Sequence, residues 1–104
     1  MEIGLFQIEN LALTRITFLL LDLRDDRSRP LPGPLSEGSI AVESVSSNKA
    51  INFLNQQAGL KDRPVVLLCE AGKTSTSLAQ ELETQGFSNV YVVAGGYEGL
   101  LLEL

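Results

Sequence analysis

The residues best suited to chemistry lie in the stretch VVLLCEAGKTSTSLA, residues 65 to 79. Cys69 is the only cysteine of the chain, and it stands where an apolar run ends. Gly72, Lys73 and the hydroxyl run TSTS follow directly. Two kinds of chemistry are open to this pattern. Lys73 could bind a phosphate, as in a nucleotide-binding loop, or Cys69 could act as a nucleophile.

The spacing of the glycines argues against phosphate binding. A P-loop requires G-x-x-x-x-G-K-[ST], because the first glycine lets the backbone fold around the phosphate. Leu67 occupies the position of that glycine and lies within an expected strand. The segment before Gly72 is therefore too short to wrap a phosphate chain, and no second acidic strand end is clearly placed to hold magnesium. Nucleotide binding through Lys73 remains the weaker alternative.

The same residues suit an activated cysteine. The thiolate is the nucleophile, and a helix N-terminus next to a cation favours that charged form. If residues 69 to 74 form a semicircular loop, the N–H groups of Glu70 to Ser75 can converge on the sulfur or on a group attached to it. Gly72 would permit the tight backbone path, and Lys73 would add positive charge.

The hydroxyl run after Lys73 separates an active cysteine from a structural one. A lone cysteine at a strand end is often a small apolar residue that closes the core. An anion-binding turn needs the glycine, the lysine and the hydroxyl residues that follow Cys69, whereas a core residue does not. The hydroxyl of Thr74 or Ser75 would cap the next helix or donate to the same site.

Composition limits the chemistry further. The chain has 104 residues, one cysteine, no histidine and a net charge of -5. The lack of histidine and of a second cysteine removes the usual metal ligand sets, any internal disulfide and every Cys-His or Ser-His pair. We therefore expect no metal and no cofactor. Because the chain is acidic and has no basic tract, we expect no nucleic-acid or membrane partner.

The apolar segments are expected to form the core of a single domain spanning residues 1 to 104. The most apolar one, ITFLLLDL at 16 to 23, contains Asp22 and is far shorter than the ~20 residues that span a bilayer. Glu2 and Glu9 lie in an N-terminal region that has no positive segment before an apolar stretch, unlike a secretory signal. We therefore expect a cytoplasmic protein.

Strands and helices are expected to alternate along the chain. Strands are predicted at residues 17–24, 39–44, 65–68 and 89–94. A first helix is predicted after a cap at Ser46 or Ser47; it would place Ile51, Leu54 and Ala58 on one face and end at Gly59. A second helix is predicted from the TSTS run to Gly86, and a third from Tyr97 onward. This is the pattern of an α/β domain with a mainly parallel sheet.

Ligands bind such sheets beyond the carboxyl ends of the strands. The loops after Leu23, Leu68 and Ala94 are therefore the candidates.

Several motifs together resemble the rhodanese-like sulfurtransferase family. CEAGKT, residues 69 to 74, resembles the six-residue active-site loop C-x-x-G-x-x between a buried strand and a helix. LLDLR resembles the family's early Asp-x-Arg strand end, and EGSI resembles its Gly-His-Ile element. GFSNVYVVAGGYEG resembles its late G-[FY]-x-N-V-x-x-[LV]-x-G-G signature. The order and spacing of the motifs match over roughly residues 17 to 100.

The resemblance implies a rhodanese-like α/β fold with a mainly parallel five-stranded sheet flanked by helices. It also implies that Cys69 takes sulfane sulfur from thiosulfate or a persulfide, holds it as a persulfide, and passes it to a thiol or cyanide-like acceptor. A sulfur-relay protein is a further partner of this kind. The loop that binds the persulfide would consist of Glu70, Ala71, Gly72, Lys73, Thr74 and Ser75. Related phosphatases and arsenate reductases use a longer C-x5-R loop, and Ser75 stands at that arginine position.

Glu70 departs from a basic loop. A carboxylate beside the nucleophile opposes thiolate formation and repels an anionic donor, and Lys73 offsets part of this effect. We therefore expect weaker activity on thiosulfate than in relatives with a basic loop. A protein persulfide or another less charged donor would fit this loop better. Ser39 replaces the histidine of the Gly-His-Ile element, and this change is expected to affect packing rather than catalysis.

Two questions stay open in the sequence. Asp22 and Arg24 form either a structural ion pair or a source of positive field at the substrate, to which Arg27 or Arg29 could contribute less. The second question is the class of function. The alternative to a sulfurtransferase is a non-catalytic rhodanese-like module that serves regulation or protein binding.

Overall fold

The structure is a computed structural model that describes residues 2–14, 18–24, 30–31, 41–56 and 63–103. Its centre is a five-stranded sheet in the order β1-β5-β4-β2-β3, and all four strand pairings are parallel. The strands are β1 (Glu2–Ile3), β2 (Leu19–Asp22), β3 (Ala41–Ser44), β4 (Val65–Leu68) and β5 (Val90–Val93). The predicted five-stranded parallel sheet is confirmed.

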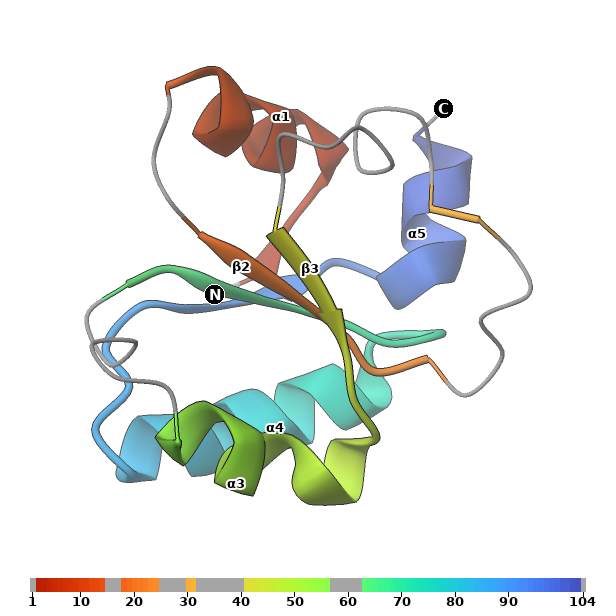
Figure 1. Ribbon diagram of the computed structural model, residues 1–104. Helices are drawn as coiled ribbons and strands as arrows, with labels where there is room; N and C mark the ends of the chain where they lie inside the picture. The colour runs from red at the N-terminus through yellow and green to blue at the C-terminus, as the bar shows by residue number, and fades with distance from the viewer. Residues whose placement is uncertain (1, 15–17, 25–29, 32–40, 57–62, 104) are drawn as a thin grey trace.

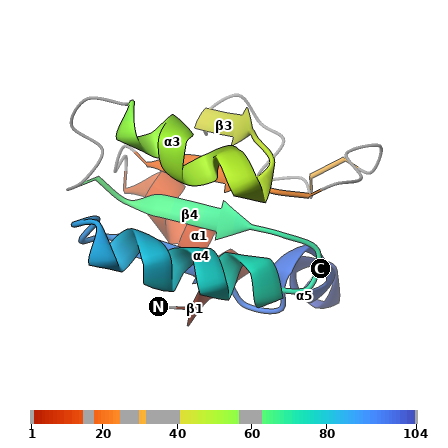
Figure 2. The same ribbon diagram turned by 90° about the horizontal axis from the view of Figure 1, so that it is seen from below.

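The described helices cover both faces of this sheet (Figure 1). Helices α1 (Leu5–Leu13) and α5 (Gly96–Leu102) lie on one face. On the other face lie α3 (Ala50–Asn55), which follows a 3-10 turn at Ser47–Lys49, and α4 (Lys73–Thr84). Figure 2, seen from below, shows α3 and α4 in front of the strands on this face. The sheet is therefore enclosed between two helical layers, as expected for an α/β fold.

The central strand β4 is buried because its residues alternate between two cores. Val65, Leu67 and then Cys69 pack in the core beneath α3 and α4, whereas Val66 and Leu68 pack in the core beneath α1 and α5. A parallel strand covered on both faces needs apolar residues throughout, which the sequence VVLL supplies. Cys69 therefore leaves the sheet on the side of α4.

The neighbouring strand β2 ends beside the cysteine. Its residues pair with those of β4 from Leu19 opposite Val65 to Asp22 opposite Leu68. Beyond the last pair, the N–H of Leu23 donates to the carbonyl of Leu68 over 2.7 Å. Arg24 is therefore carried to the same edge of the sheet as Cys69.

The sequence predictions for the described residues hold for strands β2 to β5 and for the helices that follow β3, β4 and β5. Strand β4 has the predicted bounds, whereas β2 and β5 are shorter than predicted. Residues 17, 39 and 40 of the predicted strands lie outside the described residues, as do Ala58 and Gly59 at the predicted helix end. The predicted end of α4 is confirmed, because Gly86 has a φ of 94° and its N–H donates to Glu83 over 3.2 Å. Strand β1 and helix α1 were not predicted.

The predicted side-chain cap at Ser46 or Ser47 is wrong. Ser46 has extended backbone angles before the 3-10 turn, but its side chain makes no capping hydrogen bond. The carbonyl of Ser46 instead accepts the N–H of Lys49 over 3.0 Å, which is a bond across three residues. Such a tight first turn satisfies an N–H group that a hydroxyl cap would otherwise take.

Replacing Leu82 with alanine should lower the free energy of unfolding by about 2–5 kcal/mol, because the side chain is fully buried in the core beneath α3 and α4. The matched control is Leu102→Ala, at a side chain that is 89% exposed, where we expect a change below about 0.5 kcal/mol. Urea unfolding followed by circular dichroism measures both values. Equal losses in the two variants would contradict this assignment of the core.

Candidate active site

The sulfur of Cys69 lies within the first turn of helix α4. The backbone N–H of Gly72 donates to Sγ over 3.1 Å, and the N–H of Ser75 donates to Sγ over 3.4 Å. Gly72 has a φ of 95°, the left-handed region that glycine adopts without strain, and it directly precedes the helix. The predicted convergence of backbone N–H groups on the sulfur is thus confirmed for these two residues.

The sulfur takes the place of the hydroxyl cap that the sequence suggested for this helix. Gly72 is the N-cap residue of α4, so no side-chain cap is formed. The hydroxyl of Thr76 turns back to the carbonyl of Gly72 over 2.8 Å. Because the N–H of Ser75 is directed at Sγ, the positive end of the helix acts on the sulfur and stabilises negative charge there.

Ser75 differs from the other hydroxyl residues of the TSTS run because its side chain is fully buried. It lies on the buried face of α4 with Leu78, Ala79 and Leu82. Among the described residues, its Oγ has no hydrogen-bond partner. Leaving a buried hydroxyl unpaired destabilises a fold by about 1–3 kcal/mol, so this arrangement calls for an explanation.

Helix α5 holds the cysteine loop from the other side. The N–H of Tyr97 donates to the carbonyl of Cys69 over 2.7 Å, and the N–H of Glu98 donates to the carbonyl of Glu70 over 3.1 Å. Gly96 lies so close to the loop that an added Cβ would collide with the Cys69 carbonyl and lie 2.7 Å from the nitrogen of Gly72. Gly95 and Gly96 have φ values of 71° and 63°, so this glycine pair forms a tight turn that brings α5 close to the cysteine loop.

Asp22 and Arg24 form a buried ion pair at the end of β2. The Arg24 Nε and a terminal guanidinium nitrogen donate to the two carboxylate oxygens of Asp22 over 3.0 and 2.9 Å. The backbone N–H of Arg24 adds a third bond to Asp22, over 3.1 Å. The two side chains are only 3% and 4% exposed, so the ion-pair interpretation is confirmed. Whether Arg24 also contacts substrate stays a prediction.

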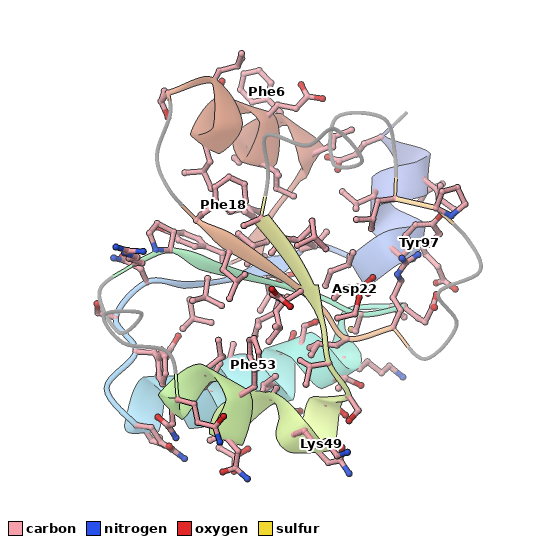
Figure 3. The ribbon with its side chains drawn as sticks, in the orientation of Figure 1. Phe6, Phe18, Asp22, Lys49, Phe53 and Tyr97 are labelled. Carbon is pink, nitrogen blue, oxygen red and sulfur yellow. The ribbon has the colours of Figure 1, made fainter. Side chains whose placement is uncertain are left out.

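Tyr97 completes this group and was missed at the sequence level. The guanidinium of Arg24 lies 4.6 Å from the centre of the Tyr97 ring, and the Tyr97 hydroxyl donates to the carbonyl of Pro30 over 2.7 Å. Figure 3 shows Asp22 and Tyr97 on the same side of the molecule, where β2 approaches α5. The signal was an aromatic residue directly after the Gly-Gly turn, but its partner Arg24 is distant in the sequence.

Arg24 keeps its charge in this environment. The hydrogen bonds that the Arg24 side chain donates to Asp22 raise the pKa of Arg24, whereas burial lowers it by disfavouring the charged form. The negative charge of Asp22, together with smaller contributions from Tyr97 and Glu70, adds to the increase in the pKa. Arg24 is therefore a permanent cation, and Asp22 balances its charge.

A pocket of about 260 Å³ opens over the sulfur. Cys69 lies in its wall together with Leu23, Arg24, Glu70, Ala71, Lys73 and Thr74. Gly72 and Ser75 reach the sulfur through their N–H groups, and Asp22 stands behind Arg24. The predicted site residues are thus brought together, while Arg27, Arg29 and the Gly38-Ser39-Ile40 element lie outside the described residues.

A larger hollow of about 480 Å³ lies on the other side of Ala71, Gly72 and Lys73, and Cys69 is not in its wall. It therefore gives no access to the sulfur.

Leu67, which stands at the first glycine position of a P-loop, is fully buried within β4, so no loop exists there to wrap a phosphate. Within the described ranges, no three histidine, cysteine, aspartate or glutamate residues could hold a metal. No described helix is long and apolar enough to cross a membrane.

Replacing Gly96 with alanine should destabilise the protein by about 2 kcal/mol or more, because the new Cβ would strain a φ of 63° and also push against the cysteine loop. Gly86→Ala is the matched control, since Gly86 has a φ of 94° but lies at the far end of α4. Urea unfolding compares the two variants. If Gly96→Ala lost no more stability than Gly86→Ala, the close approach of α5 would not constrain the loop.

Comparison with known sequences agrees with this geometry. The family model of the rhodanese-like domain matches residues 8–103. The thiosulfate sulfurtransferase GlpE of Pseudomonas entomophila (strain L48) is 34% identical over 88 residues, which cover 85% of this chain and 74% of that relative. The GlpE of Pseudomonas syringae pv. syringae (strain B728a) is 36% identical over 80 residues, which cover 77% of this chain and 69% of that relative.

Solved structures share the same architecture. The rhodanese homolog TT1651 of the extremely thermophilic bacterium Thermus thermophilus has a TM-score of 0.66 at 30% identity, covering 96% of this chain and 100% of that one. The human single-domain sulfurtransferase TSTD1 has a TM-score of 0.73 at 18% identity, covering 99% and 96%, a likeness that shows the fold alone. With the family model matching nearly the whole chain around Cys69, the protein belongs to the rhodanese-like sulfurtransferases.

Proposed function

We propose that Cys69 carries sulfane sulfur as a persulfide and transfers it from thiosulfate or another persulfide to a thiol or cyanide-like acceptor. The observation that carries this proposal is the position of Sγ, 3.1 and 3.4 Å from two backbone N–H donors at the start of α4. A helix N-terminus favours the thiolate, which is the reactive form. The names of the curated relatives, thiosulfate sulfurtransferase, support the same reaction.

Sulfur uptake and release would both take place at this sulfur. In uptake, the Cys69 thiolate attacks the outer sulfur of thiosulfate, a new S–S bond forms, and sulfite leaves with the electron pair of the broken bond. In release, the acceptor anion attacks the outer sulfur of the persulfide, and Cys69 leaves as a thiolate. Exchange of this kind depends on the attacking thiolate and on how well the leaving sulfur holds its charge.

The backbone of the loop supports an anion on Cys69. A trans peptide points its carbonyl and the following N–H in opposite directions. Because α5 binds the carbonyls of Cys69 and Glu70, the N–H groups of Glu70 and Ala71 are directed away from α5. They are thereby available to a sulfur attached to Cys69, in addition to the two N–H groups already at Sγ.

The charges around the pocket favour a donor with less charge than thiosulfate. Glu70 and Lys73 bring opposite charges to the pocket wall, and the charge of Arg24 is balanced by Asp22. These four side chains sum to zero, so the pocket offers little attraction to a dianion. A protein persulfide, presented as one small side chain, suits a pocket of about 260 Å³. The sulfur-relay partner and the cytoplasmic location stay predictions.

Incubating the protein with thiosulfate and cyanide should yield thiocyanate, and intact mass spectrometry should detect one added sulfur per chain. Cys69→Ser should abolish both signals, because no other residue of the chain is a cysteine. A protein persulfide is tested as a second donor. If neither donor leaves a sulfur on Cys69, the carrier function fails, and the non-catalytic regulatory or protein-binding module becomes the better interpretation.

Replacing Glu70 with glutamine should raise kcat/KM for thiosulfate about three- to tenfold, because one negative charge leaves the wall of the pocket while the shape is kept. The gain should shrink as ionic strength rises, since salt screens charges near the surface. Glu83→Gln, an exposed change near the far end of α4, serves as the control and should leave kcat/KM unchanged. An unchanged value in Glu70→Gln would mean that this carboxylate does not select the donor.

A further inference from the structure

We propose that the buried hydroxyl of Ser75 donates a hydrogen bond to Cys69 when Cys69 is a thiolate, so that Ser75 assists both sulfur uptake and sulfur release. This inference rests on the proposed function and deepens it. It assigns a role to a side chain that is fully buried beside the reacting sulfur and whose Oγ has no hydrogen-bond partner among the described residues.

The backbone already brings Ser75 to the sulfur. Its N–H donates to Sγ over 3.4 Å, and its Oγ is joined to that nitrogen only through Cα and Cβ. Rotation about the single Cα–Cβ bond, which has three staggered positions, is therefore the movement that redirects the hydroxyl. No rearrangement of the loop or of α4 is needed.

The protonation state of Cys69 decides whether the hydroxyl has a partner. A neutral thiol is a weak acceptor, so the hydroxyl gains little from it. A thiolate is an anion, and hydrogen bonds to ionised groups are about twice as strong as neutral ones. Because burial leaves the hydroxyl unpaired while the thiol is neutral, ionisation of Cys69 both relieves this cost and forms a strong bond.

The other hydroxyls of the TSTS run are not placed for this task. Thr76 donates to the carbonyl of Gly72 over 2.8 Å, and its side chain is exposed. Thr74 and Ser77 are also exposed, and water can satisfy their hydroxyls. Ser75 alone in this run is buried, and it shares the α4 face that packs against the core containing Cys69.

The thiolate acts twice in the reaction, so Ser75 should affect two rates. In uptake, the bond stabilises the negative charge that Sγ carries when it attacks the donor. In release, Sγ is the leaving group, and the same bond stabilises the charge that develops on it. The serine keeps its proton in both steps, so no bond of Ser75 is made or broken.

The test compares the wild-type chain with Ser75→Ala and with Ser77→Ala, an exposed serine of the same helix. Alkylation of Cys69 by iodoacetamide is followed over a range of pH. At neutral pH, Ser75→Ala should react about tenfold more slowly, the effect expected when a hydrogen bond to a charged group is lost. At strongly alkaline pH, where both thiols are ionised, the two rates should be equal. Ser77→Ala should follow the wild type throughout.

Two further measurements complete the test. Release of sulfur from the preloaded persulfide to cyanide should also slow about tenfold in Ser75→Ala. Urea unfolding at acidic pH, with the thiol neutral, should find Ser75→Ala at least as stable as the wild type, because only an unpaired hydroxyl is removed.

Three results would overturn the inference: unchanged alkylation at neutral pH, a rate loss that persists at alkaline pH, or a loss of stability or of folding in Ser75→Ala. The last would mean that the hydroxyl has a structural partner. Alkylation needs no sulfur donor, so this part of the test stands even if the wild type takes up no sulfur. Failure of the proposed function and failure of the Ser75 inference are thus distinguished.

Discussion

The geometry of the site depends on the close contact between the cysteine loop and the start of helix α5. Two N–H groups of α5, from Tyr97 and Glu98, bind the carbonyls of Cys69 and Glu70. Gly96 makes this approach possible because a Cβ there would meet the loop backbone. With its carbonyls fixed on one side, the loop presents N–H groups on the other, where the sulfur lies. This orientation is the one that the proposed persulfide anion on Cys69 requires.

The ion pair of Asp22 and Arg24 connects the end of strand β2 to this contact. Arg24 lies over the ring of Tyr97, the residue whose N–H holds the Cys69 carbonyl, so the end of β2 braces the start of α5. A buried ion pair is seldom a strong source of stability, because removing two charges from water offsets their attraction. Its contribution here is positional. It keeps a permanent cation in the pocket wall and fixes the ring beneath it.

The sequence predicted the fold and the contact of backbone N–H groups with the Cys69 sulfur well, because both depend on local patterns. The apolar run of β4, the glycine after Cys69 and the hydroxyl-rich helix start are contiguous, so their physical meaning can be inferred without knowing the rest of the chain. Of the two roles predicted for the hydroxyl of Thr74 or Ser75, the helix cap is not formed, because Gly72 is the N-cap residue in a left-handed conformation that a serine or threonine rarely adopts. A donor role at the same site stays a prediction.

Features that depend on distant residues could not be predicted. Tyr97 meets Arg24 only because β2, β4 and α5 converge at one edge of the sheet. Strand β1 is too short to give a periodic pattern, and it is recognisable only through its pairing with β5. The hydroxyl of Ser75 is unpaired because its side chain is buried in the fold, whereas Ser77, the other serine of the TSTS run, is exposed. The sequence alone does not distinguish these two serines.

The pairing of β1 with β5 joins Glu2 to Val92 and makes the sheet dependent on contacts between remote parts of the chain. Such pairings slow folding, because a long loop must close before the contact is gained. The donors from Tyr97 and Glu98 are also synthesised well after Cys69. On the ribosome, we therefore expect Cys69 to be synthesised before the loop around it can be oriented, and the proposed sulfur transfer to require that α5 has first packed against this loop.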